Sequence, residues 1–416
     1  MSSSYPDQKN LRCAASQACA FVSLVTASVG TALAADTYVQ PQMELRAESN
    51  SNFNLVPGGS PDSDVYGYIA DLQALIGIAT PRSDTSIRPR VRFQEYPDRD
   101  DFEQFEAFFD LRSLYRWERS QLRTLGRYSR QDSYNAELPS GEFDPVDPDD
   151  PANPDSGVIV IGETRERYQV GPEFTFELTE RTRAGVAANY QAVRYDSDTV
   201  SNHVDYDFYG GNVFVSWALD SRSDLTVGTY TNRYEATDDS TETDAYGGAL
   251  GYQFQWSEVA GLGVNITYEK DDTTEFVPVT VEESASGWGG TVSAFRSGEV
   301  SAWRLTAGRT FIATGAGGKA ESDQLRLQYD RDLTQRLRFT GAGRYESRNS
   351  LSTGGQGSDR DYARADLSLR WMMAPTWYLQ WGYSYVWQDQ ESATGSAENN
   401  KFFISVGYRG LERQRR

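Results

Sequence analysis

Residues 377–388 read Trp-Tyr-Leu-Gln-Trp-Gly-Tyr-Ser-Tyr-Val-Trp-Gln. Every second position of this stretch carries a large apolar or aromatic side chain, at Trp377, Leu379, Trp381, Tyr383, Tyr385 and Trp387. Because successive side chains of a β-strand point to opposite faces, this period of two predicts a strand with one apolar face and one face in contact with water. The stretch is also about twice as long as an average strand of a soluble protein.

The same alternation recurs along the chain from Thr37 onward, and it predicts about 18 strands. Short turns follow the even-numbered runs, for example at residues 179–182 and 220–223, and longer polar loops follow the odd-numbered runs. The predicted strands lie near residues 37–47, 65–80, 85–96, 103–118, 120–134, 165–179, 182–195, 204–219, 223–236, 243–257, 260–271, 285–297, 301–313, 322–331, 335–347, 360–373, 376–389 and 400–409.

An even number of antiparallel strands, with short turns at one end and long loops at the other, is typical of transmembrane β-barrels. We therefore predict an all-β fold, a transmembrane antiparallel up-and-down β-barrel of about 16–18 strands in the bacterial outer membrane. Both termini then lie on the short-turn, periplasmic side. Aromatic residues at the ends of the runs fit interfacial girdles, at Trp117, Trp217, Trp256, Trp371 and Trp377. A secreted β-sandwich or β-solenoid is the alternative, but the strands are too long for a sandwich and no residue-level repeat is present.

Composition excludes several other classes of protein. No stretch beyond the N-terminus stays apolar for the ~20 residues that a membrane-spanning helix needs, and the mean hydropathy of the chain is -0.62. The 9 Trp, 25 Tyr and 19 Phe are too many for a disordered chain. A net charge of -20 argues against nucleic acid as a partner.

The N-terminus has the pattern of a secretory signal peptide. Lys9 and Arg12 supply the positive start, an apolar segment follows from Ala20, and small residues end the segment at Ala34. We therefore predict a signal peptide over residues 1–34 and an outer-membrane β-barrel domain over residues 35–416. A C-terminal strand with alternating apolar residues resembles the signal read by the barrel-assembly machinery, at Phe402, Ile404, Val406 and Tyr408.

Few residues with catalytic or metal-binding chemistry remain in the predicted mature chain. Both cysteines, Cys13 and Cys19, precede residue 35, and His203 is the single histidine. Disulfides, zinc sites and cysteine nucleophiles are therefore excluded from the barrel. We expect His203 to be a solvated residue of an outer loop, and the alternative is a catalytic histidine at the barrel rim. We expect no cofactor, no metal and no enzyme activity.

Arginines are concentrated on the face of three neighbouring strands that should point into the lumen. A barrel of this size is too wide for side chains to fill, so a water channel is expected. The alternation places seven arginines and two acids in the lumen, at Arg88, Arg90, Arg92, Arg112, Arg116, Arg123, Arg127, Glu106 and Asp110. Further arginines lie round the wall at Arg183, Arg364 and Arg370. Two interpretations stay open, a salt-bridge ladder that stiffens the wall and a basic strip that guides anions.

Two other features bear on the lumen. The acidic, proline-rich loop at residues 136–164 is the only candidate for internal occlusion, and its segment Glu142–Asp155 fits a solvated surface loop, an inward constriction or a calcium site. Inward aromatic residues could contact sugars, and the candidates are Phe108, Tyr230, Tyr362, Tyr378 and Phe403.

Residues 38–53 read Tyr-Val-Gln-Pro-Gln-Met-Glu-Leu-Arg-Ala-Glu-Ser-Asn-Ser-Asn-Phe. This segment resembles the first strand and the asparagine-bearing loop of a family of bacterial outer-membrane β-barrel porins that is associated with exopolysaccharide-biosynthesis loci. The resemblance extends as a pattern through the mature chain. It implies an outer-membrane location and a role in polysaccharide export or surface assembly, and it carries no catalytic residues.

Two hypotheses for function follow. The first is a porin-like channel for hydrophilic, anionic solutes or acidic exopolysaccharide. The alternative is a structural or adhesive surface barrel with an occluded lumen, whose acidic loops bind a partner. The expected partners are outer-membrane lipid, the barrel-assembly machinery and anionic polysaccharide, and nucleic acid is not among them.

Overall fold

The computed structural model describes residues 35–58, 64–97, 105–138, 140, 142, 162–197, 203–238, 240–276, 280–315, 317–351, 359–390, 395–410 and 413–415. The predicted signal segment at residues 1–34 lies outside this set, as does most of the loop at residues 136–164. Within the described part of the chain, no helix is both long and apolar enough to cross a bilayer.

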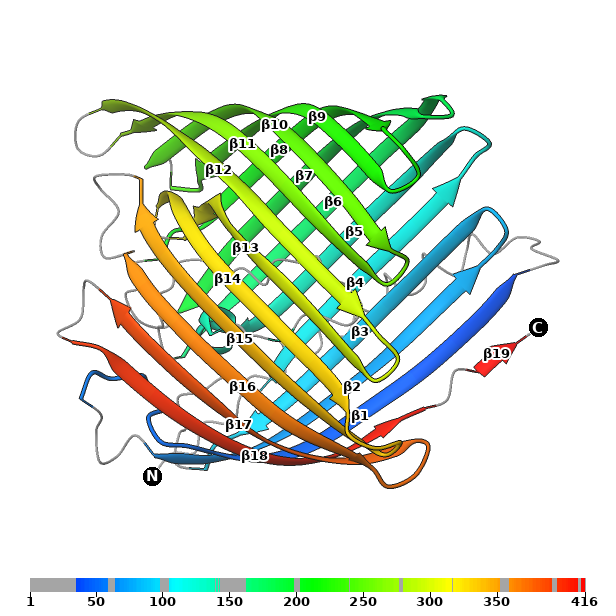
Figure 1. The fold of residues 1–416 in the computed structure, drawn as a ribbon. Helices are drawn as coiled ribbons and strands as arrows, with labels where there is room; N and C mark the ends of the chain where they lie inside the picture. The colour runs from blue at the N-terminus through cyan, green and yellow to red at the C-terminus, as the bar shows by residue number, and fades with distance from the viewer. Residues whose placement is uncertain are drawn as a thin grey trace.

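Eighteen long strands pair antiparallel, each with the next along the chain, and β1 pairs with β18 to close a barrel (Figure 1). The strands are β1 (Asp36–Asn50), β2 (Val65–Ala79), β3 (Ser83–Glu95), β4 (Phe105–Arg116), β5 (Ser120–Asp132), β6 (Glu163–Thr179), β7 (Thr182–Ser197), β8 (Tyr206–Ala218), β9 (Ser223–Ala236), β10 (Thr241–Ser257), β11 (Ala260–Glu275), β12 (Val281–Ser297), β13 (Ser301–Thr314), β14 (Gly318–Asp332), β15 (Leu337–Ser350), β16 (Arg360–Met372), β17 (Trp377–Gln390) and β18 (Ala397–Arg409). The predicted fold class and all the predicted strands are confirmed.

Both ends of the described chain lie at the short-turn end of the barrel. Asp36 at the start of β1 is paired with Ala79, next to the first short turn. The tail after Arg409 adds a further short strand, β19 (Arg413–Arg415), which pairs with β1 beyond the end of β18. This end is the periplasmic end, because short turns face the periplasm in barrels of this type.

The outer face of the wall is apolar and carries two rings of aromatic residues. One ring lies next to the short turns and contains Tyr115, Trp117, Phe174, Trp217, Trp256, Trp371 and Trp377, all exposed. The second ring lies farther along the strands, toward the long loops, and contains Tyr66, Tyr68, Tyr168, Tyr209, Tyr246, Tyr268, Trp288, Tyr345 and Phe402. Exposed aliphatic residues lie between the rings, among them Leu72, Val170, Val213, Leu250, Ile266, Val292 and Leu327.

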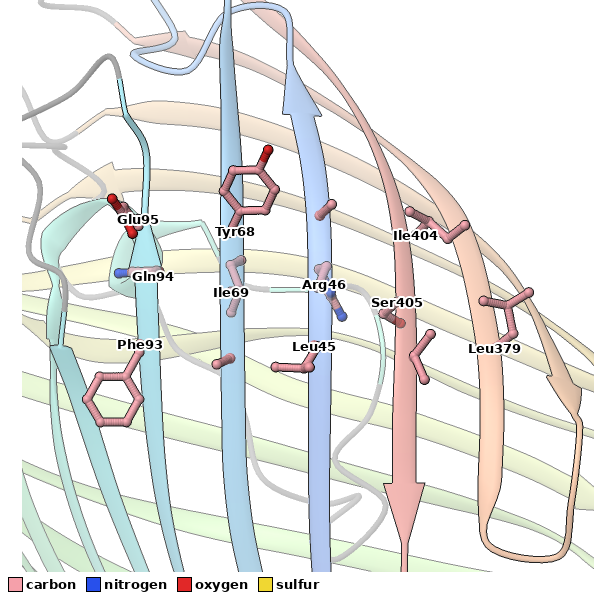
Figure 2. A pocket seen from close by; sticks show the side chains of 13 residues that line it. Leu45, Arg46, Tyr68, Ile69, Phe93, Gln94, Glu95, Leu379, Ile404 and Ser405 are labelled. Atoms are coloured by element: carbon pink, nitrogen blue, oxygen red, sulfur yellow. The ribbon is translucent and has the colours of Figure 1, made fainter.

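This exterior fits lipid and not water. Figure 2 shows a hollow in it over β1, β2, β3 and β18, lined by Leu45, Tyr68, Phe93 and Ile404. A closed barrel leaves no unpaired sheet edge in the hydrocarbon region, and two aromatic girdles mark the two interfaces of a bilayer. The protein is therefore located in the bacterial outer membrane.

The buried side chains of this barrel lie inside the lumen, where segments from the long-loop end fold inward. The loop after β1 supplies Phe53 and Leu55, and the short helix α2 (Ser133–Glu137) that follows β5 supplies Tyr134. They pack against Val65, Tyr96, Leu138, Tyr362, Val386 and Ala397. In Figure 1 the helix lies within the ring of strands.

A second buried cluster forms where the tip of the β13–β14 hairpin meets the inner face of β7, β8 and β9. Its buried members are Val193, Tyr206, Tyr234 and Ala236, and Ala313 of the hairpin packs against them. The expectation that the loop at residues 136–164 alone could occlude the lumen is therefore wrong. The loop after β1 and the β13–β14 hairpin also enter it, because each offers apolar side chains that pack on wall residues.

Candidate functional site

The arginines of β3 face the lumen, because Val91 and Phe93 occupy the outer face of the same strand. Arg90 lies 2.5 Å from Asp71 of β2. Arg92 lies 3.2 Å from Asp71 and 3.1 Å from Glu106 of β4. The ring of Phe108 of β4 lies 5.0 Å from the guanidinium group of Arg90. Both neighbouring strands, β2 and β4, therefore contribute contacts to Arg90 and Arg92.

The ladder continues toward the periplasm through Asp110. This carboxylate of β4 lies 2.8 Å from Arg88 of β3 and 3.6 Å from Arg127 of β5. Both contacts follow from the register, which places Asp110 opposite Arg88 on one side and opposite Arg127 on the other. The wall-stiffening interpretation therefore accounts for part of the arginine strip.

Asp71 is a lumen residue that sequence reasoning missed. The local alternation does not reveal its face, because β2 carries mostly apolar side chains on both faces. The register places Asp71 directly opposite Arg92 and Glu44, so the pairing of β2 with β3 is the signal that identifies it.

Two arginines at the periplasmic end differ from the rest of the strip. Arg116 ends β4 and Arg123 lies near the start of β5, and both side chains are exposed on the lumen face. Neither forms a salt bridge with a residue that the structure describes. Arg112, the remaining predicted lumen arginine, lies between them and Arg88, opposite Ser86.

The helix α2 extends from β5 into the lumen and is fixed to the wall at both sides. Its N-cap Asp132 accepts a hydrogen bond from the backbone N–H of Tyr134 at 2.8 Å. Asn135 donates to Glu106 at 2.7 Å, which links the helix to the arginine ladder. Glu137 forms a fully buried salt bridge of 2.7 Å with Arg165 of β6.

Arginines of the wall at β14 and β16 hold the end of this segment. Arg360 donates to the carbonyl oxygen of Glu137 at 3.1 Å, and Arg364 donates to that of Leu138 at 2.9 Å. Arg326 of β14 donates to the carbonyl oxygen of Glu142. These arginines anchor a chain segment that crosses the lumen from β5 to β16, and the segment narrows the passage.

The loop after β1 supports this constriction from the long-loop end. The ring of Phe53 stacks on Tyr134 of the helix at 4.3 Å between centroids and contacts Tyr96 at 4.8 Å. The hydroxyl of Tyr96 donates to Glu48 at 2.8 Å. Aromatic packing of this kind contributes about 0.5–1.5 kcal/mol per pair beyond burial.

Four of the five inward aromatic residues face an arginine. Besides Phe108, Tyr362 lies 4.6 Å below Arg360, and Tyr378 lies 4.7 Å below Arg370. Phe403 lies 4.3 Å below Arg46. Tyr362 is 1% exposed, so the prediction that it contacts sugars is wrong. These rings hold the guanidinium groups at the wall through cation–π contacts.

His203 is not a solvated loop residue, so that prediction is wrong. Its side chain is 2% exposed, and its Nδ1 atom lies 2.5 Å from a carboxylate oxygen of Glu163 at the start of β6. Its ring stacks on Tyr195 of β7 at 4.4 Å. The local sequence around residue 203 is polar and does not indicate that His203 is buried. The burial results from contacts with Glu163 of β6 and Tyr195 of β7, which are distant in the sequence.

We expect His203→Ala to destabilise the barrel at its long-loop end. Glu163 is fully buried, and loss of its partner leaves a buried carboxylate with a penalty of about 1–3 kcal/mol. The measurement is the temperature at which the folded form loses its faster mobility in detergent gels, and it should fall. His203→Gln keeps a hydrogen-bonding group and should lose less, whereas an unchanged temperature for His203→Ala contradicts the prediction.

The acidic segment for which a calcium site is one of three alternatives lies, apart from Glu142, outside the described residues. Among the residues that are described, no group of three acidic, histidine or cysteine side chains is arranged to hold a metal ion.

Comparisons with known proteins give matches among solved structures. No protein-family model and no curated protein matches the chain. The chain is similar to OpdK of Pseudomonas aeruginosa, solved with vanillate, at 12% identity and a TM-score of 0.45, covering 90% of this chain and 99% of that chain. It is also similar to the outer membrane channel DcaP of Acinetobacter baumannii at 11% identity and a TM-score of 0.44, over 91% and 99%. OccAB3 of Acinetobacter baumannii matches at 10% identity and a TM-score of 0.45, again over 91% and 99%.

Proposed function

We propose that this protein is a porin-like channel that passes hydrophilic, anionic solutes across the outer membrane. The observation that carries the proposal is the basic strip of β3, β4 and β5. It begins beside the constriction at Arg92 and ends at the periplasmic mouth with Arg116 and Arg123, which form no salt bridge in the described part of the chain. A strip of this kind raises the local concentration of anions within a low-dielectric wall.

The two groups of lumen arginines have different roles in this proposal. Arg326, Arg360 and Arg364 are occupied with the backbone of the constriction, so they shape the passage. Arg88, Arg90 and Arg92 form salt bridges with Asp110, Asp71 and Glu106, and their guanidinium groups line the lumen along the path of a solute. A guanidinium group suits a carboxylate in particular, because its planar fork matches two carboxylate oxygens.

Acidic exopolysaccharide is the larger solute that we propose for this route. The proposal rests on the resemblance of residues 38–53 to porins associated with exopolysaccharide-biosynthesis loci, and on the carboxylates that such a polymer would present to the arginine strip. An extended acidic glycan and a small organic anion carry the same group, so the strip serves both.

The decisive experiment is ion selectivity of the purified protein in a planar bilayer. A salt gradient across the bilayer gives a reversal potential, and we expect its sign to show anion preference. Cation preference would contradict the role of the strip, and absence of conductance would contradict the channel itself.

Anion preference should increase as the pH falls, because Glu142 titrates inside the lumen. Partial desolvation of its carboxyl group, and then the neighbouring carboxylate of Asp366, raise the pKa of Glu142, although nearby arginines oppose this effect. The arginines concerned are Arg370, Arg364 and Arg46. As the pH falls through a raised pKa, the side chain becomes neutral earlier than an ordinary glutamate, and the lumen loses a negative charge.

The reversal potential measured over a range of pH tests this prediction. Glu142→Gln should show at neutral pH the stronger anion preference that the unmodified protein shows in mild acid, and its pH dependence should be weaker. If Glu142→Gln retained the full pH dependence, another group would be responsible and the prediction would be wrong.

An occluded surface barrel is the second candidate, and the lumen cluster around Phe53 and Tyr134 favours it. In that case the acidic loops would bind a partner and the barrel would only present them. Conductance separates the two candidates, because an occluded barrel passes no current while a channel passes current whether or not the loops bind a partner.

We also propose that residues 1–34 direct export and are then removed, and that the barrel-assembly machinery inserts the chain. N-terminal sequencing of the protein from outer membranes should start at Ala35. A sequence starting at Met1 would contradict cleavage.

A further inference from the structure

Pairing between β12 and β13 stops far short of the long-loop end. The register runs from Ser297↔Ala302 at the periplasmic turn only to Gly290↔Arg309. On its other side β12 stays paired with β11 up to Val281↔Glu275. The segment of β12 at residues 281–289 therefore has a strand partner on one side only, as Figure 1 shows where β12 and β13 separate.

Two glycines, Gly290 of β12 and Gly308 of β13, lie where the separation begins. Gly290 has φ of +157°, and a Cβ atom at this position would lie 2.5 Å from the carbonyl oxygen of Asn265. An added Cβ at Gly308 of β13 would likewise clash with the carbonyl oxygen of Gly290. Only glycine accommodates this approach and this backbone, so the strands are in close contact here and diverge immediately above.

Beyond this point the β13–β14 hairpin leaves the wall and is fixed inside the lumen. Lys319 of β14 lies 2.5 Å from Glu269 and 2.5 Å from Asp271 of β11. At the tip, the hydroxyl of Tyr234 donates to the carbonyl oxygen of Thr314 at 3.2 Å. These buried ion pairs fix the hairpin in its inward position, because separating them would leave buried charges without partners.

A cavity of about 270 Å³ occupies the space between the β12 edge and the displaced hairpin. Asp271, Thr273 and Glu283 line it from the lumen face of β11 and β12, and Lys319 lines it from the hairpin. Ser284 also lines it, although Ser284 is on the outer face, paired with Asp272. Glu283, Ser284 and Ala285 are consecutive residues of β12, so the cavity borders the part of this strand that has no partner on the β13 side.

The cavity lies at the level of lipid headgroups. Trp288 and Tyr268 form a ring pair of the second aromatic girdle, at 5.0 Å between centroids, and Ser284 lies beyond them toward the long-loop end. Next to Ser284 the outer face carries the ion pair of Lys270 and Asp272 at 2.8 Å. Aromatic girdles sit at the membrane interface, so the outer side of the cavity faces the polar layer and not the hydrocarbon.

We propose that this cavity is a lateral portal that admits uncharged, hydroxyl-rich glycan headgroups of outer-leaflet glycolipids into the lumen. Its lining carries hydroxyl and carboxylate groups at Thr273, Ser284 and Glu283, and groups of this kind can exchange hydrogen bonds with sugar hydroxyls. Lys319, the cation among the described residues of the lining, is already paired with two carboxylates. The lining is therefore acidic in sum and disfavours phosphate-bearing headgroups, in contrast to the basic strip on β3–β5.

The test places a photoreactive group on the lumen side of the portal. Benzophenone-maleimide is attached to Thr273→Cys in a chain without Cys13 and Cys19, reconstituted in phosphatidylcholine vesicles that contain a digalactosyl diacylglycerol. The matched control is Ser129→Cys, because Ser129 of β5 is on the lumen face of a different part of the wall. We expect the yield of glycolipid adduct at residue 273 to exceed that at residue 129 about tenfold, since the portal confines the headgroup there.

A large side chain at the outer side of the cavity should close the portal. Adding Ser284→Trp should abolish the adduct at residue 273, while Ser286→Trp should leave it, because Ser286 is on the same outer face and strand but does not line the cavity. Equal yields at residues 273 and 129, no glycolipid adduct at residue 273, or an adduct unaffected by Ser284→Trp would each overturn the proposal. Free digalactose that labels residue 273 as well as the glycolipid does would also overturn it, since that sugar reaches the lumen through water. Retained fast mobility in unboiled gels shows that each variant is folded.

Discussion

Reversal of two charges, Arg116→Glu with Arg123→Glu, is expected to convert anion preference into cation preference. Both side chains lie on the lumen face at the periplasmic mouth, and neither forms a salt bridge within the described residues. Their replacement therefore changes the field of the lumen without leaving a buried carboxylate unpaired. Every permeating ion passes this mouth, so we expect the ratio of anion to cation permeability to fall about tenfold.

The reversal potential in a salt gradient measures this change, and its sign should invert. The matched control is Arg181→Glu with Arg222→Glu. These arginines are exposed in periplasmic turns at the same end of the barrel, outside the lumen, so the net charge changes equally. If the control shifted the reversal potential as much as Arg116→Glu with Arg123→Glu, the effect would come from total charge and the basic strip would have no special role.

The barrel itself could be predicted from the sequence, because its wall depends on local alternation. The face of a residue such as Trp377 or Leu327 follows from the alternation with its immediate neighbours. Contact with lipid favours apolar side chains on the outer face of every strand in the same way. Short turns and long loops then order the strands in sequence. Boundaries differ mainly at the long-loop end, where strands such as β11 and β12 extend past the apolar band and lose the alternation.

The contents of the lumen could not be predicted in the same way, because they depend on contacts between distant segments. Phe53 meets Tyr134 only when the loop after β1 and the helix after β5 fold to the same place. Asp71 becomes part of the arginine ladder only through the register of β2 with β3. The inward hairpin at β13–β14 depends on Lys319 meeting Glu269 and Asp271, and no local pattern in any of the three strands indicates this.

Removal of a single carboxylate, in Glu137→Ala, is expected to open the constriction. Glu137 is fully buried and Arg165 is 4% exposed, so the substitution leaves a buried guanidinium without its partner. Breaking a buried pair in this way costs about 3–5 kcal/mol. A helix of five residues has almost no stability of its own and depends on such anchors. A loss of about 3 kcal/mol changes the ratio of anchored to released helix about a hundredfold.

Single-channel recording measures the outcome as a larger conductance, or as frequent transitions to a larger level, because the helix no longer holds its place between β5 and β16. The control is Arg130→Ala, which breaks the outward, half-exposed pair with Glu166 at 3.5 Å and should leave conductance unchanged. The double variant Glu137→Leu with Arg165→Met should restore the original conductance, since an apolar pair of similar volume replaces a buried ion pair at little cost. An unchanged conductance in Glu137→Ala would mean that the arginines bound to the backbone, Arg360 and Arg364, hold the constriction without the salt bridge. The comparison of the single and double variants therefore separates the charge of Glu137 from the packing of the helix as the cause of the narrow lumen.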